Sequence, residues 1–216
     1  MNHLKKIREP INSITHGAGA ILAFMFTFIL SILAARANLN WPVFMVFGLS
    51  MVLAFAASAL YHGLHVSPRA EFRLKQFDHS AIYVLIAGTY TPVVWTSLPE
   101  PWRTVTLVGI WTVAVLGVCI KSFGFERLPE WLSLALYVAM GWFAVLLLPQ
   151  FMQNLPASAL VALVTGGVLY TLGVPFFAWR NKKPWLAGFG SHEVWHLFVL
   201  AGSIAHSVMV IQLIPA

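Results

Sequence analysis

Seven long apolar runs, separated by short polar connections, constrain this chain more than any other feature of its sequence. A run of about 20 apolar residues can cross the ~30 Å hydrocarbon core of a bilayer as a helix. Helices are expected because backbone groups in lipid must satisfy their hydrogen bonds within the segment. The sequence therefore predicts an all-α, polytopic membrane protein with seven transmembrane helices. The approximate bounds of these helices are 15–35, 42–64, 77–96, 103–121, 131–149, 157–179 and 191–213.

Composition excludes the soluble alternative. Hydrophobic residues make up 59% of the 216 residues and charged residues only 9%, against ~45–50% and ~25% in soluble domains. Seven spans and their connections use nearly the whole chain, so we expect a single transmembrane domain over residues 1–216. The one cysteine, Cys119, excludes an intrachain disulfide and a zinc site built from cysteines.

The basic residues predict the orientation of the chain. Eleven of the 13 Lys and Arg residues fall in segments that alternate helices would place on one side, and two fall on the other. Cytoplasmic connections carry this excess, so we expect a cytoplasmic N-terminus and an extracytoplasmic C-terminus. The same placement explains the net charge of +6 without nucleic acid as a partner. The eleven are Lys5, Lys6, Arg8, Arg69, Arg73, Lys75, Lys121, Arg127, Arg180, Lys182 and Lys183, and the two are Arg36 and Arg103.

Histidine and acidic side chains gather at one depth in this topology. His62 ends the second predicted span, Asp78 begins the third, and His192 and His196 begin the seventh, all at the cytoplasmic end. His16 lies at the same level at the start of the first span. Ionisable residues inside a membrane are costly and generally functional. The clustering therefore predicts a functional site at the cytoplasmic end of the bundle.

His192 and His196 are spaced to bind one metal ion. Residues four apart project from the same face of a helix, one turn from each other. Zinc requires at least one more protein ligand, and His62 is the best candidate because its helix ends where the seventh begins. Three histidines and one open position are typical of catalytic zinc, whereas structural zinc sites have four protein ligands. Histidine ligation without cysteine favours Zn²⁺ over magnesium or calcium.

Two polar neighbours are candidate catalytic residues. Asp78 is the only aspartate in the chain, and we predict that it hydrogen-bonds the zinc-bound water and acts as general base. Ser58 lies one turn before His62, where it can orient the water or stabilise an oxyanion. Each residue also has a simpler, purely structural interpretation. Asp78 would cap the third helix, and Ser58 would bond the carbonyl four residues before it.

Other polar residues remain open or receive a structural interpretation. His206 is ten residues from His196, ~15 Å along a helix, and is too distant to bind the same metal. Asn12 and His16 either cap the first helix or support the metal ligands. The letters His192 to His196 also match H-E-x-x-H, the pattern of zinc metalloproteases. We favour a helix-dipole role for Glu193 over proteolysis, because there is no soluble domain to form a peptide cleft.

Taken together, these motifs resemble the hemolysin III (TrhA-like) branch of the progestin and adipoQ receptor (PAQR) superfamily. The resemblance covers all seven spans. It rests on Glu9-x-x-Asn12-x-x-x-His16, Ser58-x-x-x-His62, Asp78-His79-Ser80, Ala87-Gly88-Thr89-Tyr90-Thr91-Pro92 and His192-x-x-x-His196. It implies a zinc ion held by His62, His192 and His196, with Asp78 and Ser58 nearby. It also implies a bacterial protein of the cytoplasmic membrane.

The resemblance leaves several functions open. The related adiponectin receptors and alkaline ceramidases suggest zinc-dependent hydrolysis of a lipid amide, which is our leading hypothesis, with membrane lipids as partners. The alternative is a non-enzymatic membrane-homeostasis or sensor protein in which zinc only clamps the second and seventh helices. Cytolysis and intramembrane proteolysis rank lower. The sequence does not indicate the substrate or the oligomeric state.

Overall fold

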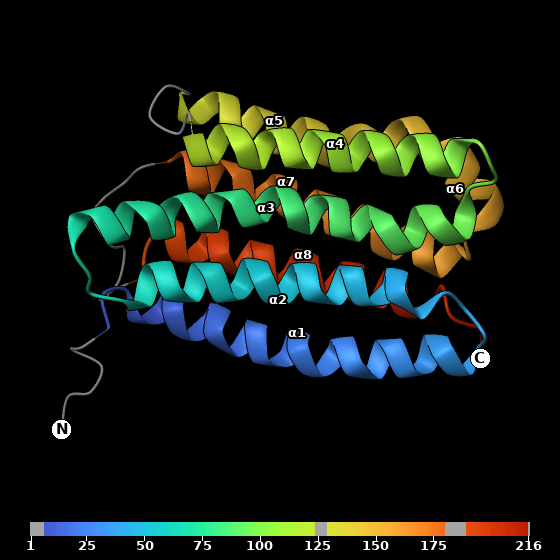
Figure 1. Ribbon diagram of the computed structural model, residues 1–216, viewed down its shortest axis with the longest axis horizontal. Coiled ribbons are helices and arrows are strands. Elements are labelled where there is room, and N and C mark those ends of the chain that lie inside the picture. The colour runs from blue at the N-terminus through green and yellow to red at the C-terminus, as the bar shows by residue number, and fades with distance from the viewer. Residues whose placement is uncertain (1–6, 124–128, 180–188, 216) are drawn as a thin grey trace.

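The computed structural model describes residues 7–123, 129–179 and 189–215, which form an all-helical bundle. The helices run nearly parallel to one another, and the described ends of the chain lie at opposite ends of the bundle (Figure 1). The elements are α1 (Pro10–Arg36), α2 (Trp41–Gly63), α3 (Pro68–Ser97), α4 (Trp102–Phe123), α5 (Glu130–Trp142), the 3₁₀ helix η3 (Phe143–Leu147), α6 (Leu148–Asn154), α7 (Ala157–Ala178) and α8 (Ser191–Ile211). The predicted all-α fold is confirmed.

The order of the helices in space brings the first and last helices together. Consecutive helices α1 to α4 pack side by side, and α7 packs along α8 (Figure 1). Helix α8 also contacts α1 and α3, the two helices that flank α2. The end of α2 therefore meets the start of α8, although the two segments are more than 120 residues apart in the sequence.

Six helical segments in the described part of the chain are long and apolar enough to cross a membrane. They are Pro10–Arg36, Trp41–Gly63, Trp102–Phe123, Trp131–Asn154, Ala157–Ala178 and Ser191–Ile211. Helix α3 does not meet this criterion, yet it runs along the same bundle among the others (Figure 1). Within its membrane-crossing part, four of its polar residues, Ser80, Thr89, Thr91 and Ser97, are buried. The chain is thus a multi-pass membrane protein whose least apolar helix is shielded by protein.

Two features differ from the sequence-based expectation. Helix α3 begins at Pro68, nine residues before the predicted start of the third span at residue 77. The Ser67 side chain accepts a hydrogen bond from the Ala70 N–H, and Pro68 suits the first helical turn because it lacks an N–H. The fifth span is interrupted by η3, just before Pro149. A proline ring clashes with the carbonyl four residues earlier and removes one helical hydrogen bond.

The segment Ala87 to Pro92 joins α3 to three neighbouring helices. At Gly88, a Cβ atom would lie 2.2 Å from the Ser50 hydroxyl of α2, so α2 and α3 approach closely there. The Tyr90 hydroxyl donates to the carbonyls of Met140 and Gly141 at the end of α5. The Thr91 hydroxyl accepts a 3.1 Å hydrogen bond from Trp111 of α4. This motif therefore has a packing role.

The predicted orientation depends largely on residues outside the described part of the chain. Lys5, Lys6, Arg127, Arg180, Lys182 and Lys183 all lie there. The cytoplasmic position of the N-terminus therefore stays a prediction.

Candidate metal centre

The three predicted metal ligands lie together at the end of the bundle where the described chain begins. His62 lies in the last turn of α2, and His192 and His196 lie in the first two turns of α8. His62 and His196 are buried, with 2% and 3% of their surface exposed, and His192 is partly buried. Contact between α1, α2 and α8 brings these side chains to one point, as the sequence predicted.

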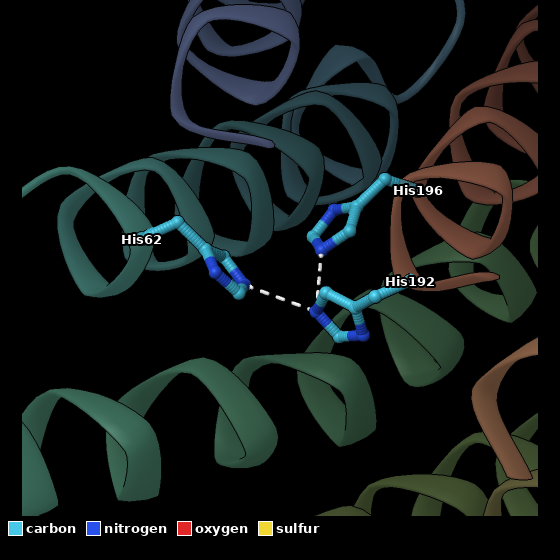
Figure 2. Close-up of side chains that lie close together, drawn as sticks. All are labelled: His62, His192 and His196. Carbon is cyan, nitrogen blue, oxygen red and sulfur yellow. Dashed lines mark hydrogen bonds between the residues drawn. The ribbon is translucent and has the colours of Figure 1, made fainter. Parts of the chain in front are cut away.

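The imidazole rings are oriented toward one another (Figure 2). The Nε2 atom of His192 is 3.5 Å from the Nε2 of His62 and 3.1 Å from the Nε2 of His196. One ligand nitrogen from each ring lies within 4.8 Å of the other two. Tetrahedral zinc with bonds of ~2.0–2.1 Å separates its ligand atoms by about 3.3 Å. The cluster therefore has the dimensions of a site that could hold a metal ion.

The remaining ring nitrogens of two ligands have their own partners. His62 Nδ1 lies 2.7 Å from Glu9 Oε2, and His196 Nδ1 lies 2.7 Å from His16 Nε2. A carboxylate can only accept, so His62 donates its Nδ1–H to Glu9 and leaves Nε2 with a free lone pair. That lone pair points toward the other two imidazoles. Such a converging set of nitrogen lone pairs is stabilised by a cation.

Hydrogen bonds extend from these partners to the start of α8. The Asn12 side-chain amide donates to Glu9 Oε2 at 3.0 Å and to Glu193 Oε1 at 2.9 Å. Glu193 also accepts a 2.7 Å hydrogen bond from the Gly190 N–H at the N-terminus of α8. This contact agrees with the helix-terminus role predicted for Glu193. Burial raises the pKa of Glu9, but the hydrogen bonds from His62 and Asn12 lower it, and the pKa lies below its ordinary value of 4.5.

Asp78 and Ser58 lie beside the histidine cluster. Asp78 in α3 interacts electrostatically with His62 and with the Ser58 hydroxyl, and both residues line the same cavity as the three histidines. Asp78 is ten residues inside α3, so the helix-capping alternative is wrong. The Ser58 hydroxyl is buried and makes no bond to the carbonyl four residues before it. The carbonyl-bonding alternative for Ser58 is therefore wrong, and the catalytic roles of both side chains stay predictions.

A cavity of about 890 Å³ extends from the histidine cluster into the bundle. Along α3 its lining begins at Lys75 and ends at Val93, and from Asp78 at the cluster to Val93 it covers fifteen residues or ~22 Å along a helix axis. Most of the lining beyond the cluster is apolar, and it includes side chains of α5, η3, α6 and α7. His206 lines the cavity far from the metal centre and hydrogen-bonds the Leu163 carbonyl at 3.3 Å. It does not belong to the cluster, as expected.

Comparison with known proteins identifies the family of this chain. The family model described as Haemolysin-III related matches residues 4–207. The chain belongs to this family. Hemolysin-3 of Bacillus cereus is 40% identical over 200 residues, which cover 91% of this chain and 88% of that protein. The Hemolysin-3 homolog of Bacillus subtilis (strain 168) is 37% identical over 202 residues, covering 92% and 91%.

A human protein is also similar to this haemolysin-III-related chain. Monocyte to macrophage differentiation factor of Homo sapiens is 30% identical over 168 residues, which cover 74% of this chain and 66% of that protein. The resemblance to the hemolysin III branch of the PAQR superfamily is thereby confirmed. The sequence did not assign the contacts of Glu9, Asn12 and His16. Their spacing indicated only that they share a face, since positions 9, 12 and 16 of a helix lie on the same side.

Proposed function

We propose that this protein is a zinc-dependent hydrolase of the cytoplasmic membrane of a bacterium, acting on the amide bond of a long-chain lipid. The proposal rests on one observation, which is that the histidine cluster, with a neighbouring carboxylate, adjoins a long apolar cavity. The similarity to bacterial family members supports a bacterial membrane.

The donor set suits zinc. Three neutral imidazoles supply nitrogen ligands, and two of them have their second ring nitrogen bound by Glu9 or His16, as is common for histidines that bind zinc. No fourth His, Cys, Asp or Glu joins the group among the described residues, which leaves a position for water or substrate. Zinc bound there lowers the pKa of water to ~7 and polarises a carbonyl group.

The neighbouring residues supply the other functions that amide hydrolysis needs. Asp78 is placed to accept a proton from the attacking water and return it to the leaving nitrogen. The Ser58 hydroxyl, which has no backbone partner, can donate a hydrogen bond to the carbonyl oxygen as negative charge develops there. Both side chains line the cavity next to His62.

The cavity fits the apolar part of a lipid. Its ~22 Å length along α3 is close to the thickness of one leaflet and more than half of the ~30 Å hydrocarbon core. Two of the lining side chains, Trp142 on α5 and Val164 on α7, are themselves exposed. We propose that a lipid chain enters the cavity beside them from the bilayer while its polar end lies at the histidine cluster.

The non-enzymatic alternative shares the metal but not the chemistry. In that case zinc would clamp α2 to α8, and the cavity and Asp78 would have no role in function. The group of three histidines, with no fourth His, Cys, Asp or Glu among the described residues, favours the enzyme, because a purely structural site is normally closed by a fourth protein ligand.

Metal content and lipid hydrolysis, measured on the same detergent-purified protein, test the proposal. We expect about one zinc per chain by elemental mass spectrometry and release of fatty acid from an N-acylsphingosine in mixed micelles. His62→Ala should lose both, whereas His65→Ala, an exposed histidine three residues later, should keep both. Zinc-loaded protein that releases no fatty acid from any of a panel of long-chain amides would overturn the hydrolase.

A further inference from the structure

We propose that Glu9, Asn12 and His16, at and just before the start of α1, are positioning residues that orient two of the three metal ligands, and that Glu9 also balances the charge of the metal. This inference rests on the metal-binding part of the proposed function. It assigns a role to the Glu9-x-x-Asn12-x-x-x-His16 pattern, which neither metal ligation nor hydrolysis explains.

The first step of the argument is the direction of each hydrogen bond. His62 donates its Nδ1–H to Glu9, which leaves Nε2 for the metal. His196 places Nε2 toward His192 and Nδ1 toward His16 Nε2 at 2.7 Å. For His196 to bind a metal through Nε2, its Nδ1 must carry the proton and His16 Nε2 must accept it. Glu9 and His16 thus select the tautomers that metal binding requires.

The second step is the rigidity of these partners. Glu9 is held against the end of α2 because its N–H donates to the His62 carbonyl at 2.9 Å, and the preceding Arg8 N–H donates to the Gly63 carbonyl at 3.3 Å. The Arg8 guanidinium also bonds the Tyr61 carbonyl and pairs with Glu71 of α3. A support fixed at several points holds the imidazole ring in one orientation, which raises the affinity for the metal.

The third step is the bridge between the two ligand helices. Asn12 is fully buried and donates to Glu9, which contacts α2, and to Glu193, which belongs to α8. Its two N–H groups therefore set the distance between the ends of α2 and α8. His16 is buried at 3% exposure and lies one turn further along α1. One face of α1 thus supports the ligands from both helices.

The fourth step is charge. Three neutral imidazoles leave the charge of a divalent cation uncompensated in a poorly solvated site, which is costly. Glu9 brings a carboxylate into direct contact with His62, and a carboxylate on the second nitrogen of a histidine makes that histidine a stronger ligand. Glu9 therefore contributes charge as well as orientation, whereas His16 contributes orientation alone.

Zinc affinity of the purified full-length protein tests these roles, measured by competition with a chromophoric chelator. We expect Glu9→Ala and His16→Ala to weaken zinc binding about 10- to 100-fold, the usual effect of losing such partners. His16→Gln, which can still place an acceptor near His196 Nδ1, should recover most of the loss. Glu9→Gln should recover only part, because it keeps the hydrogen bond but not the charge.

The matched control is Ser13→Ala on the same helix. Ser13 donates to the Ala59 carbonyl at 3.0 Å, so this variant removes a contact between α1 and α2 without touching an imidazole. It should bind zinc like the wild type. The visible spectrum of cobalt-loaded protein provides a second readout, since a rotated imidazole changes the ligand field while a loss of helix packing does not. We expect a changed spectrum for His16→Ala and an unchanged one for Ser13→Ala.

The outcomes separate this inference from the proposed function. Zinc affinity and cobalt spectra that stay at wild-type values in Glu9→Ala and His16→Ala would overturn the positioning roles and leave the hydrolase standing. Weakened zinc binding in a protein whose wild type hydrolyses no lipid would support the positioning roles and overturn the hydrolase. A wild type that binds no zinc would overturn both.

Discussion

Two histidines of the cluster, His62 and His196, use their two ring nitrogens differently. Nε2 of His62 and of His196 points toward the shared centre, and Nδ1 points toward a partner on or just before α1. Asp78 approaches His62 from α3, on the side of the cavity. A ligand, its support and a candidate base therefore come from three different helices, and a single substitution can remove one function without the others.

The Asp78→Asn variant distinguishes the zinc-dependent hydrolase from a non-enzymatic protein in which zinc only holds α2 and α8 together. The amide retains the size and hydrogen-bonding capacity of the carboxylate but cannot accept a proton as a general base. We expect the variant to keep its zinc and to lose about 10²- to 10⁴-fold in the rate of lipid amide hydrolysis. Elemental mass spectrometry and fatty-acid release, measured on one preparation, check both. Full activity in zinc-loaded Asp78→Asn would show that another group is the base.

At the residue scale, the sequence predicted the histidine cluster but not the residues that support it. His62, His192 and His196 could be chosen because helix ends set their depth and zinc chemistry requires three ligands. The contact between Glu9 and His62 could not be predicted, because Glu9 lies before the first apolar run and no rule of helix spacing connects it to α2. The close pairing of its backbone with the end of α2 makes that connection.

At the scale of elements, α7 packs closely against α8 beside the part of the cavity that His206 lines. Gly166 of α7 faces the ring of His206 on α8, and an added Cβ would lie 2.4 Å from His206 Nε2. Gly173 and Gly202 make similar approaches to aromatic side chains across the same interface. Apolar periodicity predicted both helices within a few residues, but it could not predict this interface, because both faces of each helix are apolar.

Gly166→Ala and Gly167→Ala form a matched pair that tests this packing. The first should destabilise the protein by about 1–3 kcal/mol, because the methyl group forces His206 out of its place. The second meets no atom within 4 Å and should be neutral or slightly stabilising. Thermal unfolding of the two purified variants in the same detergent measures the difference. Equal melting temperatures would show that α7 and α8 are not packed closely at Gly166.

At the scale of the whole molecule, the length and composition of the helices predicted the bundle because lipid permits few alternatives. The interruption of the fifth span and the early start of α3 were missed, since both depend on local proline geometry instead of apolar periodicity. The packing of the helices does not say which end of the bundle faces the cytoplasm, so the predicted orientation depends on the charges of the connections.

Orientation decides which side of the membrane supplies metal and substrate to the site. The α2–α3 connection lies at the same end of the bundle as the histidine cluster, and the α1–α2 connection lies at the opposite end (Figure 1). Cys119 is the single cysteine, so Cys119→Ser provides a background for labelling. Val66→Cys then marks the metal end and Asn40→Cys marks the other end, both at exposed positions.

A membrane-impermeant maleimide applied to intact spheroplasts reads this orientation directly. The 11 to 2 distribution of basic residues predicts that Asn40→Cys is labelled at once and that Val66→Cys is labelled only after the membrane is opened. That result would place the metal centre at the cytoplasmic leaflet, where the lipid amide would have to enter. The reverse labelling would place the centre at the outer leaflet, and zinc and substrate would then come from outside the cell.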